Sequence, residues 1–412
     1  MRIVYLNPAA GLGGAERCLL DMMAAVRETE PSSQLHLLVS ADGPLIERAE
    51  RLGVRVQVLP MPDSLNGIGE SLLNGPRRPR AILALGRRSV ASAWATWQYA
   101  TAISSRLVKL KPDVIHSNGI KFHMLSSLAR MPRAPVVWHI HDFLSLRPHM
   151  KRALRWASRR ARGAIAVSRA IQQDAQMVLP RLPVDLVYNA IDTDEFSPHP
   201  VPGIWLDGLA GLREANQGTI RIGLVATFAR WKGHEVYLKA VAQLLGRDPQ
   251  PAARFFVVGG PIYQTSGSQF SIAELRARTA AMGIDHNVGF VPFQRRPADV
   301  YRALDIVVHA STQPEPFGRT IVEAMACAKP VVVSQAGGAA ELFTHNRDAI
   351  GVPPNDPQAL ASALDDLMAD SGRREILGKN ARPAVVERFS RQRLGPQILA
   401  AYHRIRHAAR AA

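Results

Sequence analysis

Cysteine is scarce in this chain of 412 residues, which contains only Cys18 and Cys327. Two thiols cannot form a disulfide framework, so a small disulfide-stabilised scaffold is excluded and a reducing compartment is favoured. No uninterrupted apolar stretch reaches the roughly 18 residues that a membrane-spanning helix needs. Residues 1–8 lack the long apolar core of a secretory signal and predict a first β-strand. We therefore expect a cytoplasmic protein that does not span the membrane.

Lysine is also rare, since it supplies only 8 of the 51 basic residues, and the net charge of +17 comes mainly from arginine. Acidic residues almost disappear between residues 75 and 162, where 18 Lys and Arg are opposed only by Asp113 and Asp142, a local net charge of +16. Such a field attracts polyanions, namely nucleic acid, anionic lipid headgroups or phosphorylated ligands. The alternative interpretation is a solvated surface that only keeps the protein soluble.

Short β-rich runs alternate with stretches of helical periodicity along the chain, which is typical of parallel α/β units. We expect two Rossmann-like, doubly wound domains that face each other across a cleft, with ligands outside the carboxyl ends of the strands. The predicted strands cover residues 2–7, 35–40, 54–60, 113–118, 135–141 and 164–168 in the first domain and 220–226, 254–260, 287–292, 305–311, 330–335 and 349–354 in the second.

A stretch containing glycine and proline interrupts this alternation near the middle of the chain and predicts a linker. We accordingly place an N-terminal domain at 1–196, a linker at 197–218 and a C-terminal domain at 219–383. The basic segment 384–412 has the composition of a helix, and we expect it to pack back onto the N-terminal domain.

The strongest motif is EPFGRTIVEAM at residues 315–325, in which Glu315 and Glu323 are eight positions apart. Phe317 and Gly318 precede a helix that is predicted to begin near Arg319. A helix start offers free N–H groups and a positive dipole end, which suit a phosphate. The two carboxylates can then address two hydroxyl-bearing parts of one ligand. A capping acid and an exposed helical glutamate are the equally weighted alternative.

A second motif, ATFARWKGHE at residues 226–235, follows a predicted strand and precedes a helix. It places Arg230 and Lys232 beside Gly233 at a strand end. Two cations at such a position are what a diphosphate needs. A basic surface loop is the alternative interpretation.

Two weaker motifs lie in the first domain. GLGGAE at residues 11–16 follows the first strand, and its Gly13 and Gly14 let a ligand approach the backbone, although it lacks the full dinucleotide spacing and the phosphate-loop lysine. WHIHDF at residues 138–143 ends a strand. We expect its two histidines, His139 and His141, to point to opposite sides, with one of them toward the cleft, and a core or surface position is at least an equal alternative for His139.

Two further signals complete the set. AGGAAEL at residues 336–342 adds a glycine pair after another strand, and the DTD triplet at 192–194 predicts a structural turn. No cluster of His, Asp and Cys elsewhere suggests a metal site.

In their order and context these motifs resemble the retaining glycosyltransferases of the GT-B fold, family 4, over nearly the whole chain. The segments that carry the resemblance are GGAERCLLDMM, DVIHSNG, VVWHIHDF, IAVSRAI, VYNAIDTDEF, WKGHE, VVGG, the two spaced glutamates, AGGAAEL and GVPPNDPQALASAL. The resemblance implies a nucleotide-sugar donor, UDP- or GDP-linked, a glycan or lipid-linked acceptor in cell-surface polysaccharide biosynthesis, and no cofactor or metal. It also implies retention of the anomeric configuration, and no general base is assigned.

The resemblance also implies roles for individual residues. Lys232 would bind the donor diphosphate, Glu315 would contact the transferred sugar, and Glu323 would bind the ribose. The main chain at Phe317, Gly318 and Arg319 would approach phosphate and sugar, His141 would lie near the reacting sugar, and Gly13 and Gly14 would lie near donor and acceptor.

One position departs from the family pattern. The family usually has Gly-Arg shortly before its Lys-Gly pair, but Ala226 and Thr227 occupy that place here. The second phosphate cation is therefore missing, and Arg230 is the candidate replacement.

The basic segment falls in the half that binds the acceptor in this fold. In KRALRWASRRAR, at 151–162, four arginines recur at spacings that place them on one stripe of a helix, Arg152, Arg155, Arg159 and Arg162. Upstream, near Arg87 and Arg88, a second helical stripe comprises Val90, Trp94, Trp97, Thr101, Ser104 and Val108. Tryptophan beside cations is common at membrane interfaces, so we expect peripheral binding of residues 75–162 to an anionic inner leaflet. The alternative is that Trp94 and Trp97 belong to the core.

Other function classes remain open at this level. Nucleic acid would explain the charge but not the motifs at the strand ends, so we expect no nucleic-acid partner. Another GT-B enzyme, such as a nucleotide-sugar epimerase or a sugar phosphorylase, and a non-catalytic membrane- or polyanion-binding protein are the alternatives.

Overall fold

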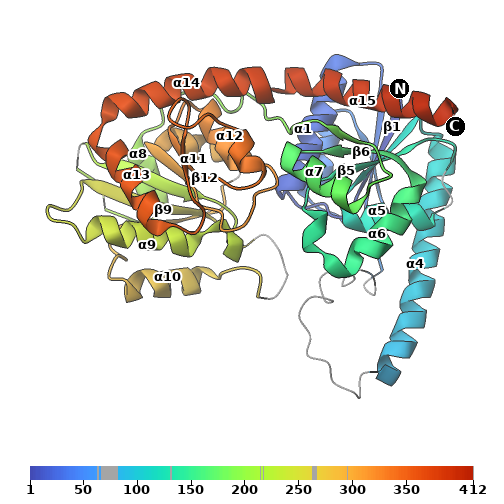
Figure 1. The fold of residues 1–412 in the computed structure, drawn as a ribbon, viewed down its shortest axis with the longest axis horizontal. Helices are drawn as coiled ribbons and strands as arrows, with labels where there is room; N and C mark the ends of the chain where they lie inside the picture. Colours follow the sequence, from blue (N-terminus) through green and yellow to red (C-terminus); the bar gives the residue numbers. More distant parts are fainter. Residues whose placement is uncertain are drawn as a thin grey trace. The chain divides into compact units, whose positions relative to one another are not determined.

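The structure is a computed structural model that describes residues 1–62, 65, 82–129, 132–213, 215–216, 218–261, 267–294 and 296–411, without the side chains of 82–92 and 410–411. The chain forms two compact units, the first made of Met1–Ala190 with Arg391–Ala412 and the second of Ile191–Ser390 (Figure 1). Each unit contains one parallel β-sheet covered by helices. The expected fold class, two Rossmann-like α/β domains, is confirmed.

The first unit has a seven-stranded parallel sheet in the order β3-β2-β1-β4-β5-β6-β7. Its strands are β1 (Arg2–Asn7), β2 (Gln34–Val39), β3 (Arg55–Val58), β4 (Val114–Asn118), β5 (Val136–Ile140), β6 (Ala161–Ala166) and β7 (Val184–Leu186). Its helices are α1 (Gly14–Thr29), α2 (Pro44–Arg51), α4 (Ile82–Leu110), α5 (Ile120–Leu128), α6 (Lys151–Ala157), α7 (Arg169–Val178) and α15 (Arg391–Ala411), with short 3-10 turns at η3 (Leu144–Leu146), η4 (Pro148–Met150) and η5 (Ser158–Arg160).

The last helix completes the core of the first unit. Leu394 and Ile398 of α15 are buried in the same cluster as Leu19 and Val26 of α1. The two helices come so close that a Cβ on Gly395 would lie 2.4 Å from the carbonyl oxygen of Ala25, so only glycine fits there. The segment that enters this unit begins at Arg391 rather than at the predicted residue 384, because 384–390 still belong to the second unit.

The second unit has a six-stranded parallel sheet in the order β10-β9-β8-β11-β12-β13. Its strands are β8 (Ile220–Val225), β9 (Ala253–Gly259), β10 (Val288–Pro292), β11 (Ile306–His309), β12 (Val331–Ser334) and β13 (Ile350–Val352). Its helices are α8 (Gly203–Leu209), α9 (His234–Leu245), α10 (Ile272–Ala281), α11 (Pro297–Ala303), α12 (Arg319–Ala326), α13 (Pro357–Ala369) and α14 (Ser371–Phe389), with 3-10 turns at η6 (Arg230–Lys232) and η7 (Gly338–Glu341).

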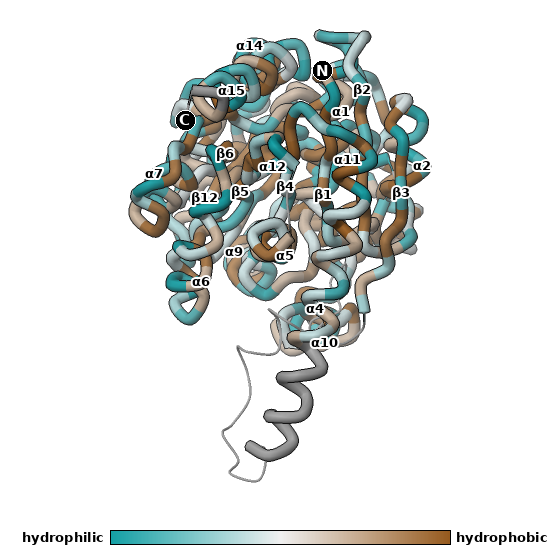
Figure 2. The backbone as a smooth tube through the Cα atoms, turned by 90° about the vertical axis from the view of Figure 1, so that its right-hand side faces the viewer, coloured by the Kyte–Doolittle hydropathy of each residue, from teal (hydrophilic) through white to brown (hydrophobic). Residues whose placement is uncertain are grey.

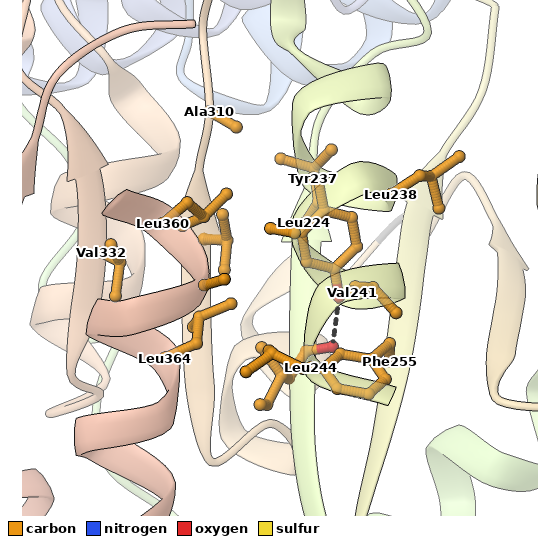
Figure 3. Packing of buried hydrophobic residues seen from close by; sticks show 14 of the residues in the cluster. Leu224, Tyr237, Leu238, Val241, Leu244, Phe255, Ala310, Val332, Leu360 and Leu364 are labelled. Atoms are coloured by element: carbon orange, nitrogen blue, oxygen red, sulfur yellow. Dashed lines mark hydrogen bonds between the residues drawn. The ribbon is translucent and has the colours of Figure 1, made fainter. Parts of the chain in front are cut away.

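The core of the second unit lies between its sheet and two helices, α9 and α13. Figure 3 shows Tyr237 and Leu244 of α9 against Phe255 of the sheet, with Leu360 and Leu364 of α13 beside them. The Tyr237 hydroxyl donates a 2.8 Å hydrogen bond to the Ile222 carbonyl, which satisfies a polar group inside an otherwise apolar cluster. Figure 2 shows hydrophilic and hydrophobic residues alternating along the covering helices, the pattern of amphipathic helices on a buried sheet.

The predicted linker at 197–218 differs from the structure, because this segment is part of the second unit. Its helix α8 carries Asp207, which is 1 % exposed and forms ion pairs with Arg221 at 2.6 Å and Arg254 at 3.2 Å. Buried ion pairs to two strands fix the segment onto the domain. The chain instead passes between the units at Ala190–Ile191 and at Ser390–Arg391.

The DTD triplet forms a turn, as predicted. Asp192 Oδ1 accepts hydrogen bonds from the backbone N–H groups of Asp194 and Glu195, both at 3.0 Å. Within the described ranges, no helix has the combination of length and apolar character that crossing a bilayer requires.

Candidate functional site

The central strands of the second unit, β8 and β11, lie next to each other although they are far apart in the sequence. From β8 the chain continues to β9 and β10 on one side of this pair, and from β11 it continues to β12 and β13 on the other side, so the pair is the point where the winding of the sheet reverses. Ligands of doubly wound sheets bind outside the carboxyl ends of the strands at such a switch point. Lys232 follows β8, and Ser311 and Glu315 follow β11.

The carboxylate of Glu315 is the centre of this switch point. Its Oε2 accepts hydrogen bonds from Lys232 Nζ at 2.7 Å and from Ser311 Oγ at 2.8 Å, and it lies 3.2 Å from His309 Nε2. No hydrogen bond joins its Oε1 to a described residue. Glu315 is only 7 % exposed. Three side chains thus contact one carboxylate oxygen, two of them as donors, and leave the other oxygen to accept from a ligand.

Burial alone would favour the neutral form of Glu315. The ammonium group of Lys232 and the hydrogen bond with His309 outweigh that effect and hold the pKa of Glu315 well below its usual range. The carboxylate is therefore ionised throughout the neutral and mildly acidic range. The buried site tolerates the charge of the Glu315 carboxylate because the ammonium group of Lys232 lies next to it.

Two glycines bring the loops together around this carboxylate. Gly233 has φ +78°, and a Cβ on it would lie 1.7 Å from the carbonyl oxygen of Ala310, so the Lys-Gly pair allows the loop after β8 to touch the end of β11. Gly337 has φ +65°, and a Cβ on it would lie 2.6 Å from the carbonyl oxygen of Glu315. Only glycine accommodates these contacts and these dihedral angles.

The AGGAAEL segment fixes the backbone of Glu315. The N–H of Glu315 donates to the carbonyl of Ala336 at 3.2 Å, and the N–H of Gly338 donates to the carbonyl of Glu315 at 2.7 Å. The glycine pair therefore acts as a backbone clamp on the loop that carries the carboxylate.

Glu323 lies inside α12 and is 4 % exposed, so it is not the exposed helical glutamate of the alternative interpretation. Its Oε1 accepts from Arg319 Nε at 2.6 Å and its Oε2 from the Tyr301 hydroxyl at 2.8 Å. Glu315 does not cap the helix either, because the N-cap Gly318, with φ +103°, is accompanied by no side-chain cap. The start of α12 thus has no side-chain cap, and a helix start of this kind suits an anion.

Phe317 and Arg230 face other parts of the second unit. The ring of Phe317 packs edge-on against Phe389 at 5.7 Å, so only its main chain is placed near the start of α12. Arg230 donates to Glu274 Oε1 at 2.8 Å and to the carbonyl of Gly267 at 3.0 Å. The structure brings Lys232 to Glu315 but joins Arg230 to α10 through Glu274.

The equivalent position in the first unit is the end of β1 and β4, its own switch point. Each of these strands ends in a buried asparagine. Asn118 Nδ2 donates to Asn7 Oδ1 at 2.6 Å, and Asn118 Oδ1 lies 2.6 Å from His141 Nε2. With the asparagine in this orientation its oxygen is an acceptor, so His141 Nε2 carries the proton and Nδ1 is the free acceptor of the neutral ring.

Burial lowers the pKa of His141 to about 4, so this imidazole is neutral at physiological pH. The ring of His139 lies only 4.0 Å from that of His141, which corrects the expectation that the two diverge. Residues two apart on a strand point to the same face. Burial and the neighbouring His141 keep the pKa of His139 well below its usual value.

The glycine motif begins α1 at the same end of the sheet. Gly13 is the N-cap and Gly14 the first helical residue. A Cβ on Gly14 would have no neighbour within 4 Å, so protein packing does not demand a glycine there. Glu16 lies in the first turn, and burial raises the pKa of this carboxyl.

Some functional candidates escaped the sequence analysis, namely His309, Ser311, Tyr301, Asn7 and Asn118. A usable signal existed for four of them, because each lies at or just after the carboxyl end of a switch-point strand, where buried polar side chains are uncommon without a purpose. Tyr301 lies 22 positions before Glu323 on another helix, and only the folded chain shows that they meet.

For the basic segment the structure corrects one prediction and one alternative interpretation. The helix of KRALRWASRRAR ends at Ala157, and Arg162 lies in β6, so the four arginines do not share one helical stripe. Trp94 and Trp97 are 59 % and 58 % exposed, so the interpretation of these two as core residues is wrong. Residues 75–81 and the side chains of Arg87, Arg88 and Val90 lie outside the described part of the chain.

The described residues contain no group of three or more His, Cys, Asp or Glu arranged to hold a metal ion.

Comparison with family models matches both halves of the chain to sugar-transferring enzymes. Residues 12–195 match the model described as Glycosyltransferase Family 4, and residues 213–383 match the model described as Glycosyl transferases group 1. A D-inositol 3-phosphate glycosyltransferase of Jonesia denitrificans is 34 % identical over 181 residues, which is 43 % of this chain and 41 % of the relative. The chain thus spans less than half the length of that curated relative.

Other similarities extend over more of the chain. An uncharacterized glycosyltransferase of Methanocaldococcus jannaschii is 27 % identical over 71 % of this chain and 75 % of its own. The crystal structure of Anabaena Alr3699/HepE in complex with UDP and glucose is 26 % identical, with a TM-score of 0.75 over 97 % of this chain and 99 % of that chain. Sucrose-phosphate synthase from Thermosynechococcus elongatus, at 19 % identity and a TM-score of 0.75 over 99 % and 100 %, shares the fold. The two family models thus match the two halves of the chain separately, and the solved structures share its two Rossmann-like α/β domains, which is the GT-B fold.

Proposed function

We propose that this protein is a retaining, metal-independent glycosyltransferase that moves a sugar from a UDP- or GDP-linked donor to a glycan or lipid-linked acceptor in cell-surface polysaccharide biosynthesis. The observation that carries the proposal is the contact between Lys232 and Glu315 at the switch point of the second unit. A buried ion pair at a ligand-binding edge, with one carboxylate oxygen unused, is more than a fold needs for its stability.

The charges fit the reaction. Breaking the bond between a sugar and a nucleotide leaves negative charge on the diphosphate and positive character on the sugar. Lys232 and the N–H groups at the start of α12 would stabilise the leaving diphosphate, and the ionised Glu315 would face the sugar. These fixed charges act without a divalent ion. Same-face attack, in which the leaving phosphate helps to take the acceptor proton, would retain the anomeric configuration without a separate base.

The remaining residues of the second unit would bind the nucleotide. Glu323 would accept hydrogen bonds from the ribose, because each carboxylate oxygen has a second lone pair beside the one used by Arg319 or Tyr301. The main chain at Phe317, Gly318 and Arg319 would approach the phosphate. Arg230 would have to leave Glu274 before it could serve as the second phosphate cation.

The first unit would contribute a neutral polar group. His141, with its Nε2 held by Asn118, would present the Nδ1 lone pair to a hydroxyl near the reacting sugar. Gly13 and Gly14 at the start of α1 would let the substrates approach the backbone. A neutral imidazole can accept a hydroxyl proton in a hydrogen bond, whereas an imidazolium cannot.

The donor is the part of the proposal that the comparisons help most. Anabaena HepE, similar over the whole chain, has been crystallised with UDP-glucose. A UDP-sugar is therefore the first donor to test, with GDP-linked sugars second. For the acceptor, binding of residues 75–162 to the anionic cytoplasmic face of a membrane would bring the enzyme to lipid-linked glycans.

The test is a ligand-observed NMR screen of UDP-, GDP-, ADP- and dTDP-sugars with EDTA present. We expect a signal for one nucleotide class, lost in Lys232→Ala and kept in Lys239→Ala, an exposed lysine of α9. The anomeric configuration of the product with that donor then tests retention. Silence across the panel from a folded protein, or binding that survives Lys232→Ala, would contradict the proposal.

A further inference from the structure

Three tryptophans of the first unit are exposed to an unusual degree. Trp94 and Trp97 on α4 are 59 % and 58 % exposed, and Trp156 on α6 is 50 % exposed. Trp138, by contrast, is 1 % exposed in β5. Tryptophan is usually largely buried, because its apolar area is the largest of all side chains. Three exceptions within one unit require a reason.

The three belong to the same layer of the unit. Helix α4 packs on α5 and α5 packs on α6, so these helices cover one face of the sheet (Figure 1). Further large apolar side chains of this layer and the segments next to it are also exposed, namely Val108 of α4, Leu128 of α5, Leu146 of η3 and Met177 of α7. The exposed large apolar residues described elsewhere in the first unit comprise only Val58. We call Trp94, Trp97, Trp156, Leu128 and Leu146 the tryptophan face.

The same layer carries many cations. Arg106 and Lys109 of α4 are exposed, as are Arg152 and Arg155 of α6 and Arg159 of η5. The segment 75–162, which contains the whole tryptophan face, has a net charge of +16 in the sequence. Apolar side chains surrounded by arginine suit a surface that is both apolar and anionic.

The kind of side chain distinguishes a lipid surface from a nucleic acid. The rings of Trp94 and Trp97 stack on each other at 5.0 Å and 27°, so one face of each ring is already covered. Aliphatic side chains such as Leu128 and Leu146 offer nothing for a base to stack on but gain free energy in the acyl boundary of a bilayer. Tryptophan itself prefers the headgroup level of a membrane.

We propose that the tryptophan face is a docking surface for an anionic lipid bilayer, in which Trp94, Trp97 and Trp156 enter the headgroup layer and the neighbouring arginines contact lipid phosphates. The tryptophan face would produce the membrane association that is part of the proposed function. Only the biological purpose of the binding rests on that proposed function. The binding itself does not depend on glycosyl transfer.

The experiment is flotation of the full-length protein with vesicles of phosphatidylcholine alone and of phosphatidylcholine mixed with phosphatidylglycerol, at physiological salt. Compared with the wild type, the variants are Trp94→Ser/Trp97→Ser, Trp156→Ser and Arg152→Glu/Arg159→Glu. Ile376→Ser is the matched control, because Ile376 is an equally exposed apolar residue, at 60 %, on α14 of the second unit. Thermal unfolding of each variant verifies that it is folded.

We expect the wild type to bind the anionic vesicles about tenfold or more better than the neutral ones. The tryptophan pair variant should lose about tenfold of that binding, the single and arginine variants less, and Ile376→Ser none. Tryptophan fluorescence should shift to the blue when the wild type meets anionic vesicles, and less in the pair variant. Nucleotide-sugar binding should be unchanged in all of them, which separates this inference from the proposed function.

Two results would overturn the inference. One is equal flotation of the wild type and the folded tryptophan pair variant with anionic vesicles. The other is binding to a single-stranded oligonucleotide that depends on the same tryptophans and exceeds the binding to vesicles, which would make the face a nucleic-acid surface.

Discussion

The two units place chemically opposite groups at the carboxyl edges of their parallel sheets. At the end of β8 and β11 a buried carboxylate, Glu315, is kept ionised by Lys232. In the first unit the half-buried imidazole of His141, which follows β5 and contacts Asn118 at the end of β4, is kept neutral, because burial lowers its pKa to about 4 and its ring nitrogen meets an amide rather than an acid. Both side chains lie at the carboxyl edge of a parallel sheet. Their protonation states differ because Glu315 has a cationic partner, Lys232, whereas His141 has a neutral amide partner, Asn118.

The two edges suit different parts of the proposed reaction. A charged pair suits a diphosphate, whereas a neutral imidazole suits hydrogen bonds with hydroxyl groups. Substitutions in the second unit should therefore reduce activity most. Substitutions beside His141 in the first unit should change the pKa of this histidine more than they change the stability of the unit.

The largest effect is expected from Glu315→Ala. The change removes the charge that faces the sugar and leaves Lys232 without its buried partner, so transfer should fall by about 1,000-fold. Release of the nucleotide from the donor in the presence of acceptor measures this. Glu375→Ala, which removes an exposed glutamate of α14, is the control and should keep full activity. Substantial activity in Glu315→Ala would remove this carboxylate from the mechanism.

Lys232→Met should remove the cationic partner of the buried Lys232–Glu315 ion pair and leave the carboxylate unpaired. Removing one partner of a buried ion pair costs about 3 kcal/mol of the free energy of unfolding at neutral pH. In the wild type the pKa of Glu315 is depressed, so its stabilising contribution is present above the unfolded-state pKa and is lost as the pH falls toward the folded-state value. The variant loses that contribution.

Chemical denaturation of Lys232→Met and the wild type between pH 3 and pH 8 measures this contribution. The gap in the free energy of unfolding should be widest at neutral pH and shrink on acidification. A gap that does not depend on pH would show that packing, not charge, is lost.

A smaller effect is expected from Ser311→Ala, which removes one of the three groups that hold Glu315 Oε2. The carboxylate stays charged but is less firmly oriented, so kcat should fall by about tenfold while KM for the donor changes little. Ser311→Thr keeps the hydroxyl and should restore most of the activity. Loss of donor binding in Ser311→Ala would instead assign this serine to the nucleotide.

The smallest change in activity is expected from Asn118→Asp. This substitution tests whether the neutral amide partner keeps His141 uncharged. An acid beside His141 Nε2 would favour the imidazolium and raise the pKa of His141 from about 4 toward its ordinary value of 6.5. Titration of the imidazole signals by NMR measures the pKa. Asn118→Leu, which adds no charge, should leave it low. An unchanged pKa in Asn118→Asp would mean that desolvation alone governs this edge.

The parts of this molecule that the sequence predicts are those encoded locally. The alternation of strands and helices and the positions of Lys232 and Glu315 at strand ends follow from short segments, because each motif is contiguous and the edge of a parallel sheet gathers them. Gly233 also has a local signature, since a glycine after the cation permits the positive φ that the loop adopts.

The parts that escaped depend on contacts between distant segments. Asp207 shows that 197–218 is not a linker, but its partners Arg221 and Arg254 lie on strands that only the fold brings near. The exposure of Trp94 and Trp97 depends on which face of α4 meets the sheet. The predicted helix at 151–162 stops early because Ala161 joins the sheet as the first residue of β6.

We propose that Lys232 and Glu315 form a diphosphate-sugar site that works with fixed protein charges. Calorimetric titration of UDP-glucose in EDTA, into the wild type, Lys232→Ala and Arg230→Ala, measures whether they do. We expect binding by the wild type, loss of at least about tenfold in affinity in Lys232→Ala, and a smaller loss in Arg230→Ala, because Arg230 is held by Glu274. Equal affinities in the wild type and Lys232→Ala would contradict it.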